Sequence, residues 1–153
     1  MIVYRLSRKK YKDQLSGYGA SLNGQRWNSK GTEVIYTAQT RALANSEVAV
    51  HISLGILPSD YHMVEIEIPN SLKILDINEK DLPKGWNSLP SKPESQNIGD
   101  KFVNENQYPV LKVPSVVVKG EFNYILNPKH SDFSKIKIIN TEPYPFDPRY
   151  FNK

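Results

Sequence analysis

Short segments rich in β-branched and aromatic residues recur along the chain, without helix-like segments regularly between them. Successive parallel strands need a crossover connection, usually a helix, so this order argues against an alternating parallel α/β sheet. It predicts an α+β fold in which a curled, mostly antiparallel sheet carries a few packed helices. The expected strands cover residues 2–6, 33–37, 63–69, 73–77, 110–118, 123–126 and 135–140.

The clearest helical segment is expected over residues 40–54. Thr40 can cap its first turn, and Gly55 can end it shortly before Pro58. The alanines and leucines of the segment favour a helix as well.

Two stretches are expected to lack regular structure. Residues 81–109 contain several prolines and glycines with little periodicity, which predicts a long irregular connection with room for a short helical turn. Such a connection is either a lid or binding loop or a passive surface excursion. The proline-rich tail, residues 141–151, is expected to be extended and docked on the body through its aromatic side chains.

A chain of 153 residues is expected to form one domain, residues 1–153. No apolar run approaches the roughly 18 residues that a membrane span needs. The absence of cysteine excludes a disulfide framework and thiol chemistry. Because no secretory pattern follows the N-terminus, a cytoplasmic location is expected by default.

A net charge of +4 is concentrated partly in one basic run, Arg8-Lys-Lys-Tyr-Lys12. Such a run is usually a solvated face. Binding of a nucleic acid is the alternative, although no helix-turn-helix, finger or stacking-platform pattern accompanies the run.

Glu47 falls in the middle of the apolar face that the expected helix presents, between Leu43 and Val50. A carboxylate carried toward a core is unfavourable unless it is paired, hydrogen-bonded or placed in a wet cleft. His51, one turn later, can pair with it. The residue is therefore either a structural ion-pair partner or a functional carboxylate.

A glycine-rich segment, residues 17–31, carries Arg26 and Trp27 directly before a strand. Its glycines do not follow a strand and open a helix, so the segment is not a dinucleotide fingerprint, and it lacks the Gly-Lys-Ser/Thr of a P-loop. Arg26 either forks onto a phosphate or carboxylate or forms a salt bridge stacked on Trp27.

Ser115 follows Pro114 in a β-branched segment, so it is expected at a bulge or at a strand entry. No Gly-x-Ser-x-Gly pattern surrounds it, which argues against a hydrolase nucleophile. The three histidines lack metal-ligand spacing, so no metal site is expected.

Taken in order, several short motifs of the chain closely resemble the RES domain family, which is named after an arginine, a glutamate and a serine. No single motif is decisive, but the ordered set covers nearly the whole chain. The motifs are Gly24-Gln-Arg26-Trp-Asn28 with Gly31, Val34-Ile-Tyr36-Thr-Ala38, Ala42-Leu-Ala-x-x-Glu47-x-x-x-His51, Val113-Pro-Ser115, Asn123-Tyr-Ile-Leu-Asn127-Pro and Phe146-Asp-Pro-Arg149.

The resemblance implies an ADP-ribosyltransferase-like fold around an NAD cleft. It also implies a toxin of a bacterial type II toxin-antitoxin system that degrades NAD by hydrolysis or phosphorolysis, with inorganic phosphate as a co-substrate in the second case. NAD would be the substrate, and no cofactor is expected. The implied partner is an Xre-type helix-turn-helix antitoxin that blocks the active site and provides the only link to DNA. Whether the chain forms a homodimer stays open.

Carried over by position, the resemblance places Glu47, Arg26, Tyr36 and Ser115 at the catalytic site. Arg26 would hold the diphosphate, Tyr36 the nicotinamide half, and Ser115 the ribose or carboxamide. Further contacts to NAD are expected from the neighbouring positions Trp27, His51 and Asn127.

Three other functions remain open at this point. An ADP-ribosyltransferase would use the same site but pass the sugar to a protein or nucleic acid. An RNA-directed toxin or nucleic-acid-binding module would work through the basic run and bind with a steep salt dependence. A catalytically inactive interaction protein would keep only the fold.

Overall fold

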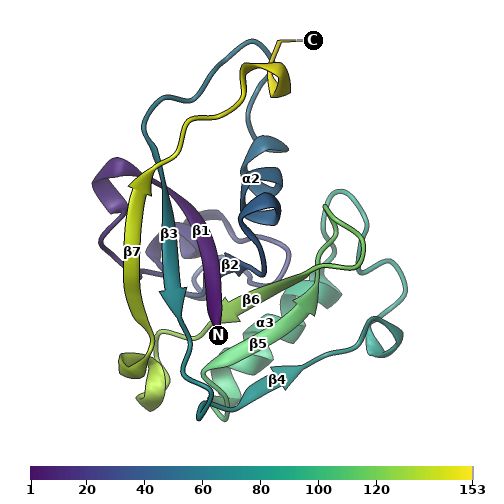
Figure 1. Cartoon of the computed structure of the whole chain (residues 1–153). Coiled ribbons are helices and arrows are strands. Elements are labelled where there is room, and N and C mark those ends of the chain that lie inside the picture. Colours follow the sequence, from purple (N-terminus) through teal and green to yellow (C-terminus); the bar gives the residue numbers. More distant parts are fainter. Residues whose placement is uncertain (153) are drawn as a thin grey trace.

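A computed structural model describes residues 1–152 as seven strands in one sheet, with helices packed on it (Figure 1). The strand order is β4-β5-β6-β2-β1-β3-β7, and every pairing is antiparallel except β4 with β5. This arrangement confirms the α+β expectation. The strands are β1 (Ile2–Arg8), β2 (Ile35–Ala38), β3 (Tyr61–Glu67), β4 (Ile74–Asp76), β5 (Val110–Pro114), β6 (Phe122–Leu126) and β7 (Lys137–Pro143).

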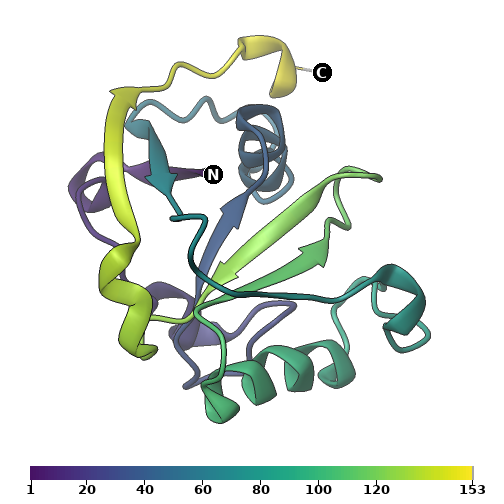
Figure 2. The ribbon, with the colours of Figure 1, turned by 60° about the horizontal axis from the view of Figure 1, so that its bottom comes forward.

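Three α-helices accompany the sheet: α1 (Tyr18–Asn23), α2 (Arg41–Ala49) and α3 (Pro93–Glu105). In Figure 2, α3 runs below β5 and β6, and β2 points toward α2 at the other end of the molecule. Short 3-10 turns at Lys9–Tyr11, Glu79–Asp81, Ser131–Lys135 and Pro148–Tyr150 complete the secondary structure. Among the described residues, no helix is long and apolar enough to cross a membrane.

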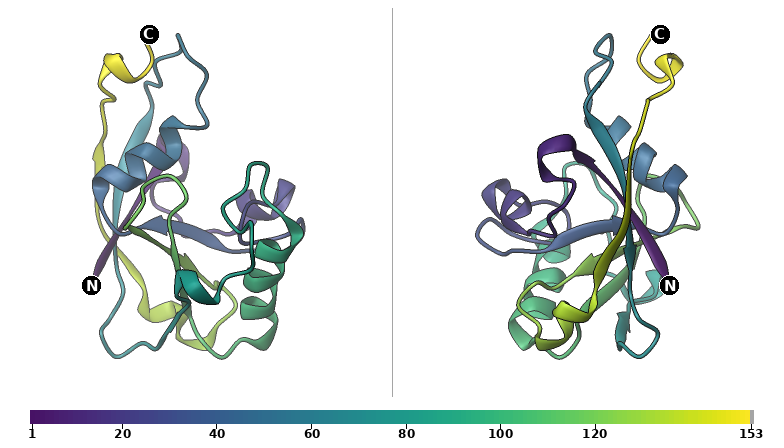
Figure 3. Two further views of the ribbon diagram at one scale, coloured as in Figure 1. Left: turned by 90° about the vertical axis from the view of Figure 1, so that its right-hand side faces the viewer. Right: turned by 60° about the vertical axis from the view of Figure 1, so that its left-hand side comes forward.

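The centre of the sheet is weakly joined. Strands β1 and β2 pair through one register position, Tyr4 with Ala38, whereas β1 and β3 pair along their whole length. Figure 3 shows β1 and β2 running at a steep angle to each other. The sheet therefore opens into two halves beyond Tyr4, and the side chains that line this opening are not covered by a neighbouring strand.

The main core lies inside the curl of the sheet. Val64 of β3 and Val110 of β5 belong to one buried cluster although three strands separate them in the sheet order. Ile136, in the segment before β7, closes the same cluster. The same cluster contains Val3 of β1, Ile35 of β2 and Leu126 of β6, so it runs across five neighbouring strands on one face of the sheet.

Two further clusters seat the helices. Leu43 of α2 packs with Leu6, Ala38 and Met63, while α3 packs through Phe102 against the β5–β6 half. Because Tyr4 and Ala38 are direct partners, and Ala38 pairs in turn with Asn123, these side chains share one face of the sheet. Helix α2 thus stands beside the opening between the two halves.

Helix α2 ends earlier than its sequence suggests. Thr40 caps it as expected, because its side chain accepts a hydrogen bond from the Leu43 N–H at 3.0 Å. The helix ends at Ala49, before the β-branched Val50 and Ile52, and tightens there into a turn rather than continuing to Gly55. Val50 is consequently exposed and does not extend the buried face.

Helix α3 replaces the expected irregular connection over much of residues 81–109. Pro93 occupies the first turn of this helix, where its missing N–H and fixed φ suit a helix start. Buried residues at positions 95, 99, 102 and 103 then follow helical spacing. The expectation was wrong because the glycines and prolines around the helix hid this period.

Other elements begin or end a few residues away from the boundaries predicted from the sequence. The fifth expected strand stops at Pro114 instead of residue 118, and the glycine-rich segment contains the short helix α1. The tail continues β7 to Pro143 and then docks through the buried Phe146 and Phe151, as expected. Phe151 meets Phe146 edge to face, with ring centroids 5.6 Å apart.

Candidate active site at the opening of the sheet

A cavity of about 1200 Å³ lies at the opening between β1 and β2. Drug-sized ligands occupy pockets of roughly 300–1,000 Å³, so this space can hold a dinucleotide. Its walls come from the divergent end of β1, the glycine-rich segment, β2, α2 and the loops near Leu89 and Val116. Of the residues predicted for the site, Arg26, Trp27, Tyr36, Glu47 and His51 line it.

Glu47 is the central carboxylate of the cavity wall. It stands on α2, two residues before the helix end, and one of its oxygens, Oε1, accepts a hydrogen bond from Ser115 Oγ at 3.2 Å. Burial raises the pKa of Glu47, while hydrogen bonding from Asn123 and Ser115 and the nearby charges of His51 and Arg26 oppose that rise. The carboxylate is therefore partly desolvated and held by neutral donors, with no ion pair among residues 1–152.

Ser115 reaches Glu47 from the first position after β5. Its hydroxyl oxygen also accepts from the N–H groups of Val117 and Val118, at 3.0 and 3.1 Å, so the tight turn fixes its position. Ser115 is buried and is not part of the cavity wall. It follows the end of β5 rather than lying at a bulge or strand entry as expected, and its direct contact is with the glutamate.

The N-terminus of α2 is tied to the same turn. Thr40 Oγ1 donates to a carboxylate oxygen of Glu121 at 2.7 Å while it accepts from the Leu43 N–H. Gln39 bonds Phe122 through both its backbone N–H and its side-chain oxygen. These contacts hold the helix that carries Glu47 against the hairpin that carries Ser115.

Arg26 contacts backbone rather than a carboxylate. Its Nη1 donates to the carbonyl oxygens of Trp86 and Ser88, at 2.7 and 3.0 Å. Burial lowers the pKa of Arg26, and the nearby Glu47 opposes that change. Within residues 1–152 the guanidinium makes no other hydrogen bond. Its remaining N–H groups are therefore available to a ligand.

Tyr36 organises the glycine-rich segment. Its hydroxyl donates to Asn28 Oδ1 at 2.6 Å and accepts from the Trp27 N–H at 3.0 Å. Burial raises the pKa of this hydroxyl. The ring lines the cavity, but both bonds of the hydroxyl hold protein groups, so its contact with a ligand in this conformation is made by the ring.

Helix α3 buttresses the segment from behind. The Trp27 ring stacks on Trp86, with centroids 6.1 Å apart, and Asp100 accepts from both the N–H and the hydroxyl of Ser29. A Cβ atom on Gly99 would lie 1.5 Å from the Trp27 carbonyl oxygen, so glycine alone permits this approach. The unexpected helix α3 thus positions the loop that carries Arg26.

The two weaker candidates have different surroundings. His51 lines the cavity but is exposed, just past the end of α2. Asn127 lies outside the cavity wall and is fully buried. Its Nδ2 donates to Asn106 at 2.8 Å and its oxygen accepts from the Lys129 N–H at 3.0 Å, which is a structural role that the motif could not reveal.

Sequence reasoning missed two residues of the cavity. Asn123 lines it beside Glu47 and donates to the Thr37 carbonyl oxygen at 3.3 Å. Arg5 lies on the divergent part of β1, and its buried Nη1 has no hydrogen-bond partner among the described residues. Burial lowers the pKa of Arg5. From the sequence, an arginine in an expected strand is interpreted as a surface charge. Only the opening between β1 and β2 shows that Arg5 lines the cavity.

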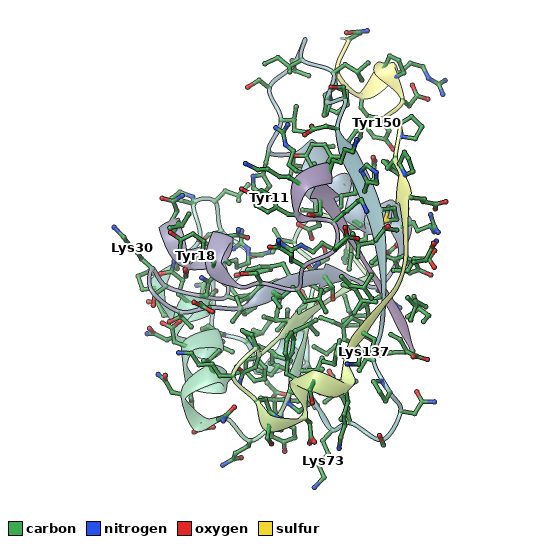
Figure 4. The ribbon with its side chains drawn as sticks, turned by 90° about the vertical axis from the view of Figure 1, so that its left-hand side faces the viewer. Tyr11, Tyr18, Lys30, Lys73, Lys137 and Tyr150 are labelled. Atoms are coloured by element: carbon green, nitrogen blue, oxygen red, sulfur yellow. The ribbon has the colours of Figure 1, made fainter. Side chains whose placement is uncertain are left out.

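The basic run noted in the sequence faces solvent. Lys9, Lys10 and Tyr11 form an exposed turn, and Figure 4 shows Tyr11 on the outer surface near β1. Arg8 pairs with Asp60 at 2.6 Å. In the same view Lys30 projects outward from the glycine-rich segment. The solvated-face interpretation therefore accounts for Lys9, Lys10 and Tyr11, whereas Arg8 also lines the cavity.

The site combines one partly desolvated carboxylate with three guanidinium groups in a cavity of dinucleotide size, and one of these, Arg8, is paired with Asp60. Such cations suit phosphate oxygens, and such a carboxylate suits a developing positive charge or a proton transfer. Among residues 1–152, no group of three or more His, Asp or Glu side chains is placed to hold a metal ion.

Comparison with known proteins identifies relatives of this chain. The chain is 41% identical over 143 residues to "Toxin Res" of Photorhabdus laumondii and 38% identical over 143 residues to "Prs ADP-ribosylating toxin" of Sphingobium sp.; each match covers 92% of this chain and 89% of the relative. "Toxin Res" of Yersinia enterocolitica is 34% identical and covers 97% of this chain and 99% of its own length.

A solved structure shares the fold. A chain of the M.tuberculosis MbcT-MbcA toxin-antitoxin complex superposes with a TM-score of 0.74 at 18% sequence identity, covering 98% of this chain and 86% of that one. The sequence model of the RES domain matches residues 2–147. The resemblance read from the motifs is thereby confirmed, and the chain belongs to the RES domain family.

Proposed function

We propose that this protein is the toxin of a toxin-antitoxin system and that it cleaves the nicotinamide-ribose bond of NAD. The observation that carries the proposal is Glu47, a partly desolvated carboxylate in the wall of a cavity that also presents Arg5 and Arg26. Three relatives that are more than 30% identical over at least nine-tenths of the chain are named as toxins, which supports the biological role.

Glu47 would act on the sugar. When the C1′–N bond breaks, its electron pair goes to the cationic pyridinium ring, so nicotinamide leaves neutral and needs no proton. Positive charge develops on the ribose, as in glycoside hydrolysis, and a carboxylate stabilises it. Glu47 would then accept a proton from the attacking nucleophile, a task suited to a carboxylate whose pKa is raised.

The two arginines would hold the diphosphate. Arg5 has a buried, unpartnered Nη1 among the described residues, and Arg26 keeps donors free while its Nη1 anchors the loop. Charge-assisted hydrogen bonds to phosphate oxygens would satisfy both groups. The ring of Tyr36 would pack against the nicotinamide half, and Ser115 would orient Glu47 through the bond between them.

The acceptor of the ADP-ribosyl group distinguishes two related activities. Water or inorganic phosphate as acceptor would make the protein an NAD glycohydrolase or phosphorylase that depletes cellular NAD. A macromolecular acceptor would make it an ADP-ribosyltransferase, and the Sphingobium relative called "Prs ADP-ribosylating toxin" favours this second candidate. The bond-breaking step is the same in both.

An antitoxin partner follows from the same proposal. The structural neighbour belongs to a toxin-antitoxin complex, which supports a cognate antitoxin for this chain as well. We expect an Xre-type helix-turn-helix protein that occludes the cavity and supplies any contact with DNA. An antitoxin that bound the chain yet left NAD turnover unchanged would contradict this arrangement.

The central experiment compares wild type with Glu47→Gln, which removes the charge and keeps the shape. Each protein is incubated with NAD, with and without phosphate and with cell extract, and nicotinamide release is followed by chromatography with mass detection. Wild type should release nicotinamide and Glu47→Gln should not, whereas the exposed Glu67→Gln serves as a matched control and should behave as wild type.

The co-product identifies the acceptor. Free ADP-ribose indicates hydrolysis, its 1-phosphate indicates phosphorolysis, and an ADP-ribose adduct on extract protein indicates transfer. No nicotinamide release by wild type under any of these conditions would refute the proposal.

A further inference from the structure

The loop Trp86–Ser91 contributes Leu89 and Ser91 to the cavity wall, and hydrogen bonds anchor its backbone at several points. Arg26 bonds the carbonyl oxygens of Trp86 and Ser88, and Ser95 Oγ of α3 donates to the same Trp86 carbonyl oxygen at 3.2 Å. Within the loop, Ser88 Oγ donates to the Pro90 carbonyl oxygen at 3.1 Å. The loop therefore holds a defined shape at the cavity wall.

Leu89 lies within this anchored loop. It lines the cavity together with Ser91, yet 83% of its surface is exposed, more than for any other large hydrophobic residue among those described. It takes no part in the three buried clusters of the core. Because Leu89 is mostly exposed and lies outside these clusters, it buries little apolar area in the fold, and its place in the cavity wall leaves its side chain available to a ligand.

The polar groups of the cavity already match the charged parts of a dinucleotide. Arg5 and Arg26 suit the diphosphate, and Glu47 suits the reacting ribose, whereas Leu89 offers neither a charge nor a hydrogen bond. The remaining parts of NAD are the hydroxyl-bearing adenosine ribose and two planar rings, and the ring faces are the surfaces that an aliphatic side chain can cover.

We propose that Leu89 is a specificity-determining residue that packs against the face of a ring of the bound dinucleotide. The inference rests on the proposed function, since it takes NAD as the ligand. Arg26 connects the two parts of the site, because the guanidinium that would bind the diphosphate also fixes the carbonyl of Ser88 directly before Leu89. The contact with the ring is thereby preorganised, because the loop does not have to become ordered when the ligand binds.

The test measures NAD binding by calorimetry in the Glu47→Gln background, where turnover does not interfere. Leu89→Ala should weaken NAD binding about tenfold, equivalent to about 1.4 kcal/mol. Leu54→Ala is the matched control, because Leu54 is also exposed, at 67%, and lies outside the cavity wall; it should leave the dissociation constant unchanged. Neither substitution should shift the thermal midpoint.

ADP-ribose, which lacks nicotinamide, identifies the ring. Weaker binding of both NAD and ADP-ribose by Leu89→Ala would support the inference and assign the adenine. Weaker binding of NAD alone would support it and assign the nicotinamide. An unchanged dissociation constant for both ligands, or an equal loss in Leu54→Ala, would overturn the inference.

The inference and the proposed function can fail separately. Binding of NAD without nicotinamide release by wild type would remove the proposed reaction while the effect of Leu89→Ala still decides the inference. An absence of NAD binding by both wild type and Glu47→Gln would overturn both.

Discussion

Replacing Tyr36 by phenylalanine tests whether the glycine-rich segment is held by one hydroxyl. That hydroxyl bonds two groups of the segment, Asn28 Oδ1 at 2.6 Å and the Trp27 N–H at 3.0 Å. Both residues are buried, so water cannot readily replace the lost partner. The ring of Tyr36 and its packing are kept, which confines the perturbation to the two hydrogen bonds.

The expected cost follows from these two groups. A buried donor or acceptor left unsatisfied destabilises a protein by about 1–3 kcal/mol. Asn28 keeps the bonds of its Nδ2 to three carbonyl oxygens, so the segment loosens without losing its turn. We expect a loss of about 2–4 kcal/mol in the free energy of unfolding, or about 5–15 °C in the thermal midpoint for a chain of this size.

Urea and thermal unfolding of wild type and Tyr36→Phe measure this loss. Tyr124→Phe is the matched control, since Tyr124 is buried and its hydroxyl makes no hydrogen bond among residues 1–152. Affinity for NAD should fall together with stability in Tyr36→Phe, because Arg26 lies in the loosened segment. Equal destabilisation by the two substitutions, or less than about 1 kcal/mol for Tyr36→Phe, would refute the reasoning.

Three further predictions concern the cavity and its support. Arg5→Met removes a guanidinium whose Nη1 is buried without a partner among the described residues, so it should leave the thermal midpoint unchanged or raised while weakening NAD binding in calorimetry. Gly99→Ala should lower both the thermal midpoint and NAD affinity, because a Cβ atom would collide with the Trp27 carbonyl oxygen. NAD cleavage should disappear as pH falls through the raised pKa of Glu47, so the acid midpoint of kcat/KM should lie above the ordinary value of 4.5. Asn123→Ala should move that midpoint higher still, since hydrogen bonding from this amide lowers the pKa.

Much of the fold was readable from local patterns. β-Branched and aromatic runs predicted the strands, and Thr40 correctly marked the start of α2. Helix α3 was missed because the prolines and glycines around it obscured its periodicity, although Pro93 suits a first turn. The premature end of α2 was missed because Gly55 seemed a sufficient terminator, whereas β-branched residues ended the helix before it.

The candidate site was predictable in its identities and not in its contacts. The ordered motifs singled out Arg26, Tyr36, Glu47 and Ser115, and the structure gathers them around one cavity. Their neighbours were not readable, because a motif records which residue type stands at a position and not what it touches. Asn127 illustrates this limit, since its amide is used entirely inside the protein.

The sequence by itself determined the class of fold and the family and singled out the candidate site residues, because periodicity, capping and ordered motifs are local properties of the chain. Only the tertiary structure decided where β1 parts from β2, and with it the exposure of Arg5 to the cavity, the anchoring of the Leu89 loop by Arg26 and the close approach of Gly99 to Trp27. These features depend on contacts between segments that lie far apart in the sequence, and such contacts leave no local pattern.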